Sequence, residues 1–138
     1  MHYFCVKIKN SIFFTKMNFL GNIIWLVFGG ILTALEYLIS SVLMMLTIIG
    51  IPFGLQTLKL GMLSLWPFGH KVIESGNSGG CLYMIMNVLW IILGGLTICL
   101  THLGLGILFC ITIIGIPFGR QHFKLAWLAL TPFGKTIV

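Results

Sequence analysis

The sequence predicts an all-α membrane protein of two tandem repeats, each a short transmembrane or re-entrant helical hairpin followed by an amphipathic interfacial helix. Three observations predict this fold class. Apolar residues make up 59% of the 138-residue chain and charged residues only 7%, with a mean hydropathy of +1.12, whereas soluble domains carry about 25% charged residues. The apolar residues fall into two long runs, and the two halves of the chain match each other. A soluble globular domain, a disordered chain and a nucleic-acid-binding module are therefore excluded.

The charges are strongly biased towards basic residues. Eight basic and two acidic residues give a net charge of +6. In membrane proteins such an excess marks the cytoplasmic side, where it meets anionic lipids. Residues 1–16 contain Lys7, Lys9 and Lys16, and we interpret them as a basic, cytoplasmic N-terminal extension. The apolar run that follows is longer than the ~7–15 residues of a signal-peptide core. Met17 is an alternative start that would leave both repeats intact.

An internal repeat is the strongest signal in the sequence. At an offset of 65 residues, residues 19–71 align with residues 84–136 without a gap and with 23 identities in 53 positions. Residues 47–54 and 112–119 are identical at all eight positions. Polar, glycine and proline positions coincide as well, which shared hydrophobicity would not require, so the pattern indicates duplication. We divide the chain into the extension 1–16, a first repeat 17–73, a polar glycine-rich linker 74–80 and a second repeat 81–138.

Each repeat begins with an apolar run, Phe19 to Ile51 in the first and Leu82 to Ile116 in the second. A straight helix of about 33 residues would be about 50 Å long, but a bilayer core is only about 30 Å thick. If each run folds back on itself, every basic residue falls on one side, as the positive-inside rule favours. We therefore expect turns at Glu36-Tyr37 and Thr101-His102. The protein would be multi-pass, with parallel repeats and cytoplasmic termini, although spans of about 15–18 residues leave re-entrant hairpins open.

A helix break follows each run. Proline ends a preceding helix and suits the first turn of a new one. The short helices expected after these breaks, Leu55–Trp66 and Arg120–Leu130, carry basic residues on one face and apolar residues on another, which is typical of an interfacial helix. Their Gln-x-x-Lys pairs are candidates for contact with anionic lipid or a partner protein. The breaks are at Pro52, Gly54, Pro117 and Gly119, and the contact candidates are Gln56, Lys59, Gln121 and Lys124.

Other polar and small residues within the runs allow two interpretations. The asparagines suit a capping or interhelical hydrogen bond, and paired glycines permit close helix packing. Alternatively, both line a path or form a hinge between the repeats. These candidates are Asn22, Asn87, Gly29, Gly30, Gly94 and Gly95.

The remaining titratable side chains are expected to be solvated. We expect Glu36 and His102 to lie in water at the turns, and His70 and His122 to contact headgroups. The cysteines Cys5, Cys81, Cys99 and Cys110 have no metal-ligand spacing and are expected to act as small packing residues. The sequence contains no catalytic triad, acid pair, phosphate loop or metal cluster. We therefore expect no enzyme, no cofactor, no metal and no nucleic-acid partner.

The repeated unit resembles the YccF family of small bacterial inner-membrane proteins. The resemblance is carried by Asn22 to Leu26 with Gly29-Gly30, by Ile49 to Gly54, by Lys59, and by Leu65 to Gly69. The second repeat carries the corresponding Asn87, Trp90, Gly94-Gly95, the Ile-Pro-Phe-Gly run ending at Gly119, and Pro132-Phe133-Gly134. It covers residues 17–136 and implies a bacterial inner-membrane location. It implies no activity and no functional residues.

Three classes of function remain open. The first is a non-enzymatic membrane protein that forms part of an oligomeric assembly, as a homo-oligomer or with another membrane protein, and surrounded by membrane lipids. The second is an oligomeric channel or transporter for anions or small solutes, with Asn22, Asn87, Thr47 and Thr112 around a central path. A third is a lipid-organising role at the membrane surface. The sequence favours the first because two units of about 53 residues bury little surface by themselves.

Overall fold

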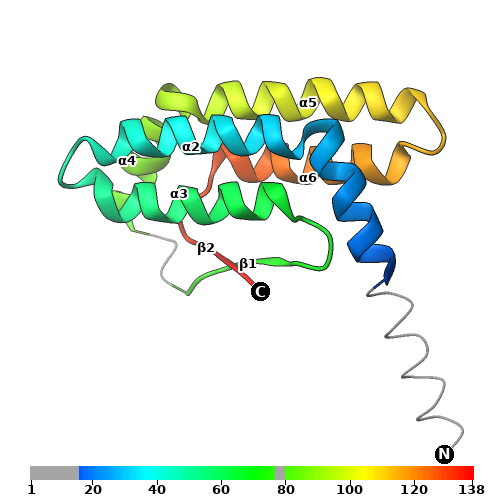
Figure 1. The fold of residues 1–138 in the computed structure, drawn as a ribbon. Helices are drawn as coiled ribbons and strands as arrows, with labels where there is room; N and C mark the ends of the chain where they lie inside the picture. The colour runs from blue at the N-terminus through cyan, green and yellow to red at the C-terminus, as the bar shows by residue number, and fades with distance from the viewer. Residues whose placement is uncertain (1–15, 77–79) are drawn as a thin grey trace, which may run out of the picture.

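The computed structural model describes residues 16–76 and 80–138, and these residues are mostly helical (Figure 1). Residues 1–15 of the predicted N-terminal extension and residues 77–79 of the predicted linker lie outside the described residues.

Each repeat begins with one long apolar helix that bends at its glycine pair. The helix Lys16–Met45 passes through a π-helical turn at Leu26–Gly30, with a kink at Gly29, and continues as α2 (Ile31–Met45). The helix Cys81–Ile111 consists of α4 (Cys81–Trp90), a π-helical turn at Ile91–Gly95 and α5 (Leu96–Ile111). π-Turns are a recognised cause of helix bending. Both helices are long and apolar enough to cross a membrane.

The predicted turns in the middle of the apolar runs are wrong. Glu36-Tyr37 lies inside α2 and Thr101-His102 inside α5, and Tyr37 and His102 are fully buried. The chain reverses later, at Thr47–Ile49 and Thr112–Ile114. The Thr47 hydroxyl donates to the Met44 carbonyl and accepts from the Gly50 amide, which closes that turn. Glu36 and Thr101 did not need a solvated turn, because the Thr101 hydroxyl donates to Glu36 of the other repeat.

The predicted amphipathic helices are the second arms of the hairpins. Helix α3 (Gly50–Leu65) packs back along α2, and α6 (Ile116–Leu130) packs back along α5 (Figure 1). Both helices begin four or five residues earlier than predicted, with Pro52 and Pro117 in their first turns. Gly54 and Gly119 lie inside these helices, where a Cβ would meet the Ser41 carbonyl oxygen at 2.9 Å and the Gly106 carbonyl oxygen at 2.8 Å. Glycine therefore allows the two arms of each hairpin to approach closely.

A pseudo-two-fold axis relates the two repeats. Glu36 contacts its repeat equivalent Thr101, and along α2 and α5 the contacts run in opposite directions, with Phe28 near Phe109 and Ser40 near Gly94. Such reciprocal contacts between equivalent positions are the mark of a two-fold arrangement. As a result, α2 and α5 lie side by side and antiparallel, and the two hairpin turns lie at opposite ends of the molecule (Figure 1).

A two-stranded antiparallel sheet lies on the same axis and was not predicted. Strands β1 (Val72–Glu74) and β2 (Lys135–Ile137) pair with Val72 opposite its repeat equivalent Ile137. Each strand follows a Pro-Phe-Gly turn whose glycine has a positive φ, +95° at Gly69 and +85° at Gly134, which L-residues adopt at a cost. Glu74, the first residue of the predicted linker, is the last residue of β1. The all-α class therefore omits this short strand ribbon.

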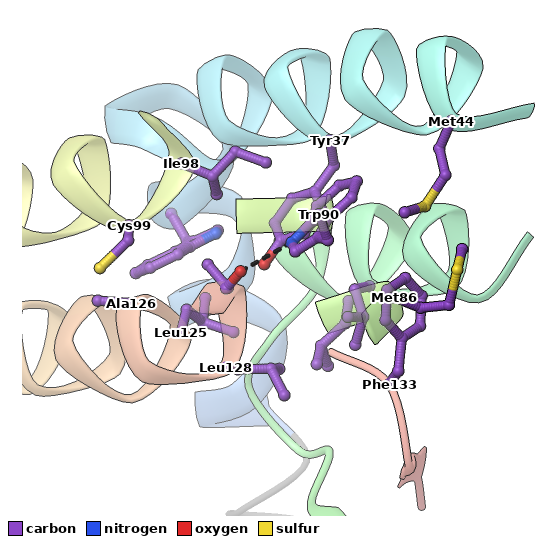
Figure 2. Packing of buried hydrophobic residues seen from close by; sticks show 14 residues of the cluster. Tyr37, Met44, Met86, Trp90, Ile98, Cys99, Leu125, Ala126, Leu128 and Phe133 are labelled. Carbon is purple, nitrogen blue, oxygen red and sulfur yellow. Dashed lines mark hydrogen bonds between the residues drawn. The ribbon is translucent and has the colours of Figure 1, made fainter. Parts of the chain in front are cut away.

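The core lies where the two repeats meet. Figure 2 shows Tyr37 of α2 beside Trp90 of α4, with Met86 and Phe133 close by. The Tyr37 and Trp90 rings stack with their centroids 6.1 Å apart, and Phe133 meets the Trp90 ring edge-on. Because these side chains come from both repeats, the two units share one core.

Candidate functional site

The glycine pairs and tryptophans of the repeat signature hold the ends of the hairpins. The Trp25 indole N–H donates to the Ser64 carbonyl at 2.6 Å, and the Trp90 indole N–H donates to the Ala129 carbonyl at 2.8 Å. Both rings are buried. A Cβ at Gly30 or Gly95 would lie 2.6 Å from the Cδ1 atom of the ring in its own repeat. The second glycine of each pair therefore makes room for the tryptophan.

The first glycine of each pair faces the other repeat. A Cβ at Gly29 would lie 3.0 Å from Leu105 Cδ1 and 3.2 Å from the His122 ring, and a Cβ at Gly94 would clash with the Ser40 side chain. These two positions bring the bend of one long helix close to the straight part of the other.

Both asparagines contact the Pro-Phe-Gly turn of their own repeat. Asn22 is fully buried and makes two bonds to Phe68: its side-chain N–H donates to the carbonyl at 3.0 Å, and its Oδ1 accepts from the amide at 2.9 Å. Asn87 Oδ1 accepts from the Phe133 amide at 3.2 Å. Polar backbone groups buried in an apolar protein need such partners.

A buried histidine pair lies in the second hairpin. His102 of α5 and His122 of α6 are fully buried, and their Nδ1 atoms are 2.9 Å apart. One Nδ1 must carry a proton and the other must accept it, so at least one ring is neutral. The His122 ring stacks on Trp25 of the first repeat, with centroids 4.0 Å apart. The expectations that His102 is solvated and that His122 contacts headgroups are therefore wrong.

Several buried polar atoms lack a hydrogen-bond partner among the described residues. Glu36 accepts a hydrogen bond from the Thr101 hydroxyl at 2.8 Å through Oε1, so it does not lie in a solvated turn. The unpartnered atoms are Glu36 Oε2, Tyr37 Oη, His102 Nε2 and His122 Nε2. Within residues 16–76 and 80–138, no three histidine, cysteine, aspartate or glutamate side chains gather as a metal site would require.

Several basic residues line two hollows beside the strand ribbon. The first hollow, of about 310 Å³, lies beside β2 and is lined by Lys59, Met62, Leu63, Trp66, His70 and Ile137. The second, of about 230 Å³, lies beside β1 and is lined by Val72, Ile73, Glu74, Lys124, Trp127, Leu128 and Lys135. Several residues that line one hollow are the repeat equivalents of residues that line the other, for example Lys59 and Lys124. The two-fold axis therefore relates the two hollows.

The two hollows differ in charge. In the second, Glu74 is paired across the ribbon with Lys135, and the Lys135 ammonium also donates to the Thr131 hydroxyl at 3.0 Å. Burial lowers the pKa of Lys135, and the nearby Glu74 carboxylate opposes this by raising it. In the first hollow Lys59 is exposed, and no carboxylate is among the lining residues.

The glutamines of the Gln-x-x-Lys pairs bind across the repeats. The Gln56 side chain donates to the Lys135 carbonyl at 2.6 Å, and the Gln121 side chain donates to the Pro67 carbonyl at 3.4 Å. Each glutamine thus reaches the segment that follows the second hairpin arm of the other repeat, α6 for Gln56 and α3 for Gln121. The lysines one turn later, Lys59 and Lys124, are exposed.

Sequence reasoning missed His122, Tyr37 and Thr57 as interior polar groups. A signal was present in the repeat alignment: Tyr37 aligns with His102, and Thr57 aligns with His122. These are places where polar or aromatic residues replace one another within otherwise apolar helices. In the first repeat, Thr57 hydrogen-bonds Ser41 at 2.6 Å, in place of the histidine pair of the second.

Comparison with known proteins identifies the family. The model of the YccF family, described as an inner membrane component domain, matches residues 20–70 and 85–135. The chain belongs to the YccF family. Its two matched segments lie within the two repeats, each beginning inside the long helix and ending just after the Pro-Phe-Gly turn. The tandem arrangement expected from the sequence is thus confirmed.

Two curated relatives support this membership. The chain is 34% identical to the protein named inner membrane protein YccF in Escherichia coli K12, over 128 residues that cover 85% of this chain and 84% of the relative. The Shigella flexneri protein of the same name gives the same values. No solved structure matches the chain. The names of these YccF relatives state a membrane location and no enzymatic activity, and this chain is accordingly an inner membrane protein.

Proposed function

We propose that the protein is a non-enzymatic, integral component of an oligomeric assembly in the bacterial inner membrane, and that it acts through its outer surface. The observation that carries the proposal is the filled space between the repeats. Trp25, Tyr37 and Trp90 are buried there with at most 1% of their surface exposed. A protomer packed in this way offers a solute no route between its described repeats. What it presents to its surroundings is lipid-facing apolar surface and one basic face.

The arrangement of charges supports a particular orientation. The turns at the hairpin ends are apolar, and Ile48 and Ile113 are each 87% exposed. The strand ribbon lies between these ends (Figure 1), and Lys135 is the first residue of β2. If the hairpins stood upright in the bilayer, the ribbon would lie near its centre, at a cost of about 2.5–3.5 kcal/mol for each lysine. We propose that the hairpins lie along the membrane plane, with the two-fold axis along the membrane normal and the ribbon at the cytoplasmic surface.

This orientation keeps the parallel repeats and cytoplasmic termini expected from the sequence, but not the expected crossings of the bilayer. Repeats related by an axis along the membrane normal have the same orientation relative to the bilayer. Both hairpins are then re-entrant from the cytoplasmic side. Lys16 begins the first long helix two residues before Asn18, which packs beside Gly69 of the turn before β1. The start of the described chain and its end at β2 therefore lie together on the basic, cytoplasmic side.

Native mass spectrometry of the protein in lipid nanodiscs tests the assembly. We expect a discrete oligomer whose subunit number does not change over a tenfold range of protein concentration. A protein that remains monomeric in nanodiscs, and that yields no crosslinked membrane protein in intact cells, would contradict the proposal.

Cysteine labelling in spheroplasts tests the orientation. On a cysteine-free background, Ile48→Cys and Ile113→Cys should both resist a membrane-impermeant maleimide from either side, because both turns lie in hydrocarbon. Lys71→Cys, in the exposed segment before β1, is the matched control and should react only after the cytoplasmic side is opened. Labelling of Ile48→Cys and Ile113→Cys from opposite sides would instead show upright hairpins.

One observation favours an oligomeric channel or transporter as a second candidate. The unpartnered polar atoms of Glu36, Tyr37, His102 and His122 lie inside an otherwise apolar protein, and intramembrane ionisable residues commonly mark transport pathways. If this candidate is right, liposomes containing the protein will pass anions or small solutes, and His122→Leu will reduce the flux. A discrete oligomer without flux above that of empty liposomes would leave the assembly role alone.

A further inference from the structure

We propose that the first hollow and the adjoining groove form a binding site for one anionic phospholipid, with its phosphate at Lys59 and an acyl chain between α2 and α3. The proposal uses the orientation inferred above, in which the ribbon lies at headgroup level, and it adds a specific ligand.

The polar end of the site is the hollow beside β2. Lys59 is exposed at this hollow and makes no hydrogen bond or ion pair with residues 16–76 or 80–138. His70 lies on the same hollow, and its Nδ1 is 3.1 Å from the Trp66 carbonyl. Because a carbonyl oxygen only accepts, Nδ1 carries the proton of that bond, and Nε2 can donate to a phosphate oxygen only when the ring is an imidazolium. The Lys59 ammonium is therefore the main donor for a phosphate group here.

The apolar end of the site is a groove between α2 and α3. It has a volume of about 230 Å³, and its lining is almost entirely apolar. The side chain of Met62 lines both this groove and the hollow, so the two spaces meet at that residue. The groove is lined by Ile31, Ala34, Leu35, Leu38, Leu58, Gly61, Met62 and Leu65.

Trp66 marks the level at which the two ends join. It lines the hollow directly after the end of α3, and its ring lies 5.8 Å from that of Phe19. Tryptophan is enriched at the boundary between headgroups and hydrocarbon. A phospholipid placed here would therefore have its charged part at the ribbon and its chain in the apolar groove, as the orientation requires.

The second repeat provides an internal comparison, because it differs at both ends of the site. Its hollow contains Glu74, which repels phosphate and already faces Lys135 across the ribbon. At the groove positions, Phe123 and Trp127 replace Leu58 and Met62. Both side chains are larger than those they replace, and the Phe123 ring packs against α5, where a Cβ at Gly106 would lie 3.0 Å from it. The site is accordingly assigned to the first repeat alone.

Native mass spectrometry of the detergent-solubilised full-length protein, titrated with phosphatidylglycerol or phosphatidylethanolamine of the same chain length, tests the site. We expect one tightly retained phosphatidylglycerol and weaker phosphatidylethanolamine. Lys59→Gln should weaken phosphatidylglycerol binding about fivefold, corresponding to about 1 kcal/mol for a lysine near an anionic lipid surface. The matched control Lys124→Gln, at the equivalent position, should leave this binding unchanged.

A second variant tests the acyl chain. Leu58→Phe with Met62→Trp installs the residues of the second repeat on a partly exposed surface, and should abolish tight retention while circular dichroism stays unchanged. Equal loss in Lys59→Gln and Lys124→Gln, equal binding of both lipids, or full displacement by inorganic phosphate would each overturn the proposal. The measurement is made on solubilised protein, so its failure is distinguishable from a failure of the proposed orientation or assembly.

Discussion

Replacing Gly95 by alanine should destabilise the protein, although alanine is the better helix former. A Cβ at this position would lie 2.6 Å from Trp90 Cδ1, 2.7 Å from Trp90 Nε1 and 2.9 Å from the Ala129 carbonyl oxygen. The indole cannot move away without breaking its 2.8 Å hydrogen bond to that carbonyl. The methyl group therefore enters the closest contact between the long helix and the end of α6.

The expected magnitude follows from three opposing effects. Overpacking a filled site costs about 1–3 kcal/mol, and losing the indole hydrogen bond costs about 1 kcal/mol. Helix propensity returns about 1 kcal/mol. The net loss for Gly95→Ala is about 1–3 kcal/mol. Gly104→Ala is the matched control on the same helix, because a Cβ there meets nothing within 4 Å. Gly104→Ala should be neutral or stabilise by up to about 1 kcal/mol.

The assay is equilibrium unfolding in mixed micelles with increasing SDS, followed by tryptophan fluorescence. The two variants should differ by about 2–4 kcal/mol in free energy of unfolding, from the overpacking and hydrogen-bond terms that act at one position only. Equal stability of Gly95→Ala and Gly104→Ala would refute the claim that this glycine exists to seat the tryptophan. Gly30→Ala should behave like Gly95→Ala, because a Cβ there meets the Trp25 ring at 2.6 Å.

Two further predictions concern buried polar groups and use the same unfolding assay. Asn22→Leu should lower the free energy of unfolding by about 2–3 kcal/mol and Asn87→Leu by less. The reason is that Asn22 makes two hydrogen bonds to the Phe68 backbone, whereas Asn87 makes one to the Phe133 backbone. Equal losses in the two variants would contradict this explanation. His102→Leu and His122→Leu should each lower the free energy of unfolding by about 1–3 kcal/mol, because each leaves the Nδ1 atom of the remaining histidine without its partner. The double variant should cost less than the sum of the two single variants. Strict additivity would show that the two histidines do not act as a pair.

The extent of each apolar run could be predicted from the sequence, but the single long helix that it forms could not. The 65-residue repeat, the apolar runs and the restart of the chain at Pro52 and Pro117 follow from local patterns of hydropathy, glycine and proline. The turns were placed at Glu36-Tyr37 and Thr101-His102 on the assumption that polar residues in an apolar run need water. In the structure Glu36 and Thr101 satisfy each other across the two-fold axis, a partner that lies in the other repeat and that no local pattern reveals.

The candidate site, too, could be predicted only in part from the sequence. Lys59, Lys124, Gln56 and Gln121 could be chosen from the sequence, because duplication preserved them on an amphipathic pattern. The ribbon that gathers them could not, because β1 and β2 are three-residue strands, each of which pairs only with the strand of the other repeat. The burial of His102 and His122 was equally hidden, because it depends on stacking against Trp25 from the first repeat.

The sequence by itself determined that this is a membrane protein of two duplicated helical units with an excess of basic charge, because composition and repeat pattern are properties of the chain. Only the tertiary structure decided how the units combine. The bends at the glycine pairs, the antiparallel contact of α2 with α5 and the pairing of β1 with β2 all depend on contacts between residues about 65 positions apart. Those contacts bring Lys59, Lys124 and Lys135 to hollows beside the ribbon and give the two related halves different surfaces, of which the first has a hollow lined by no carboxylate next to an apolar groove.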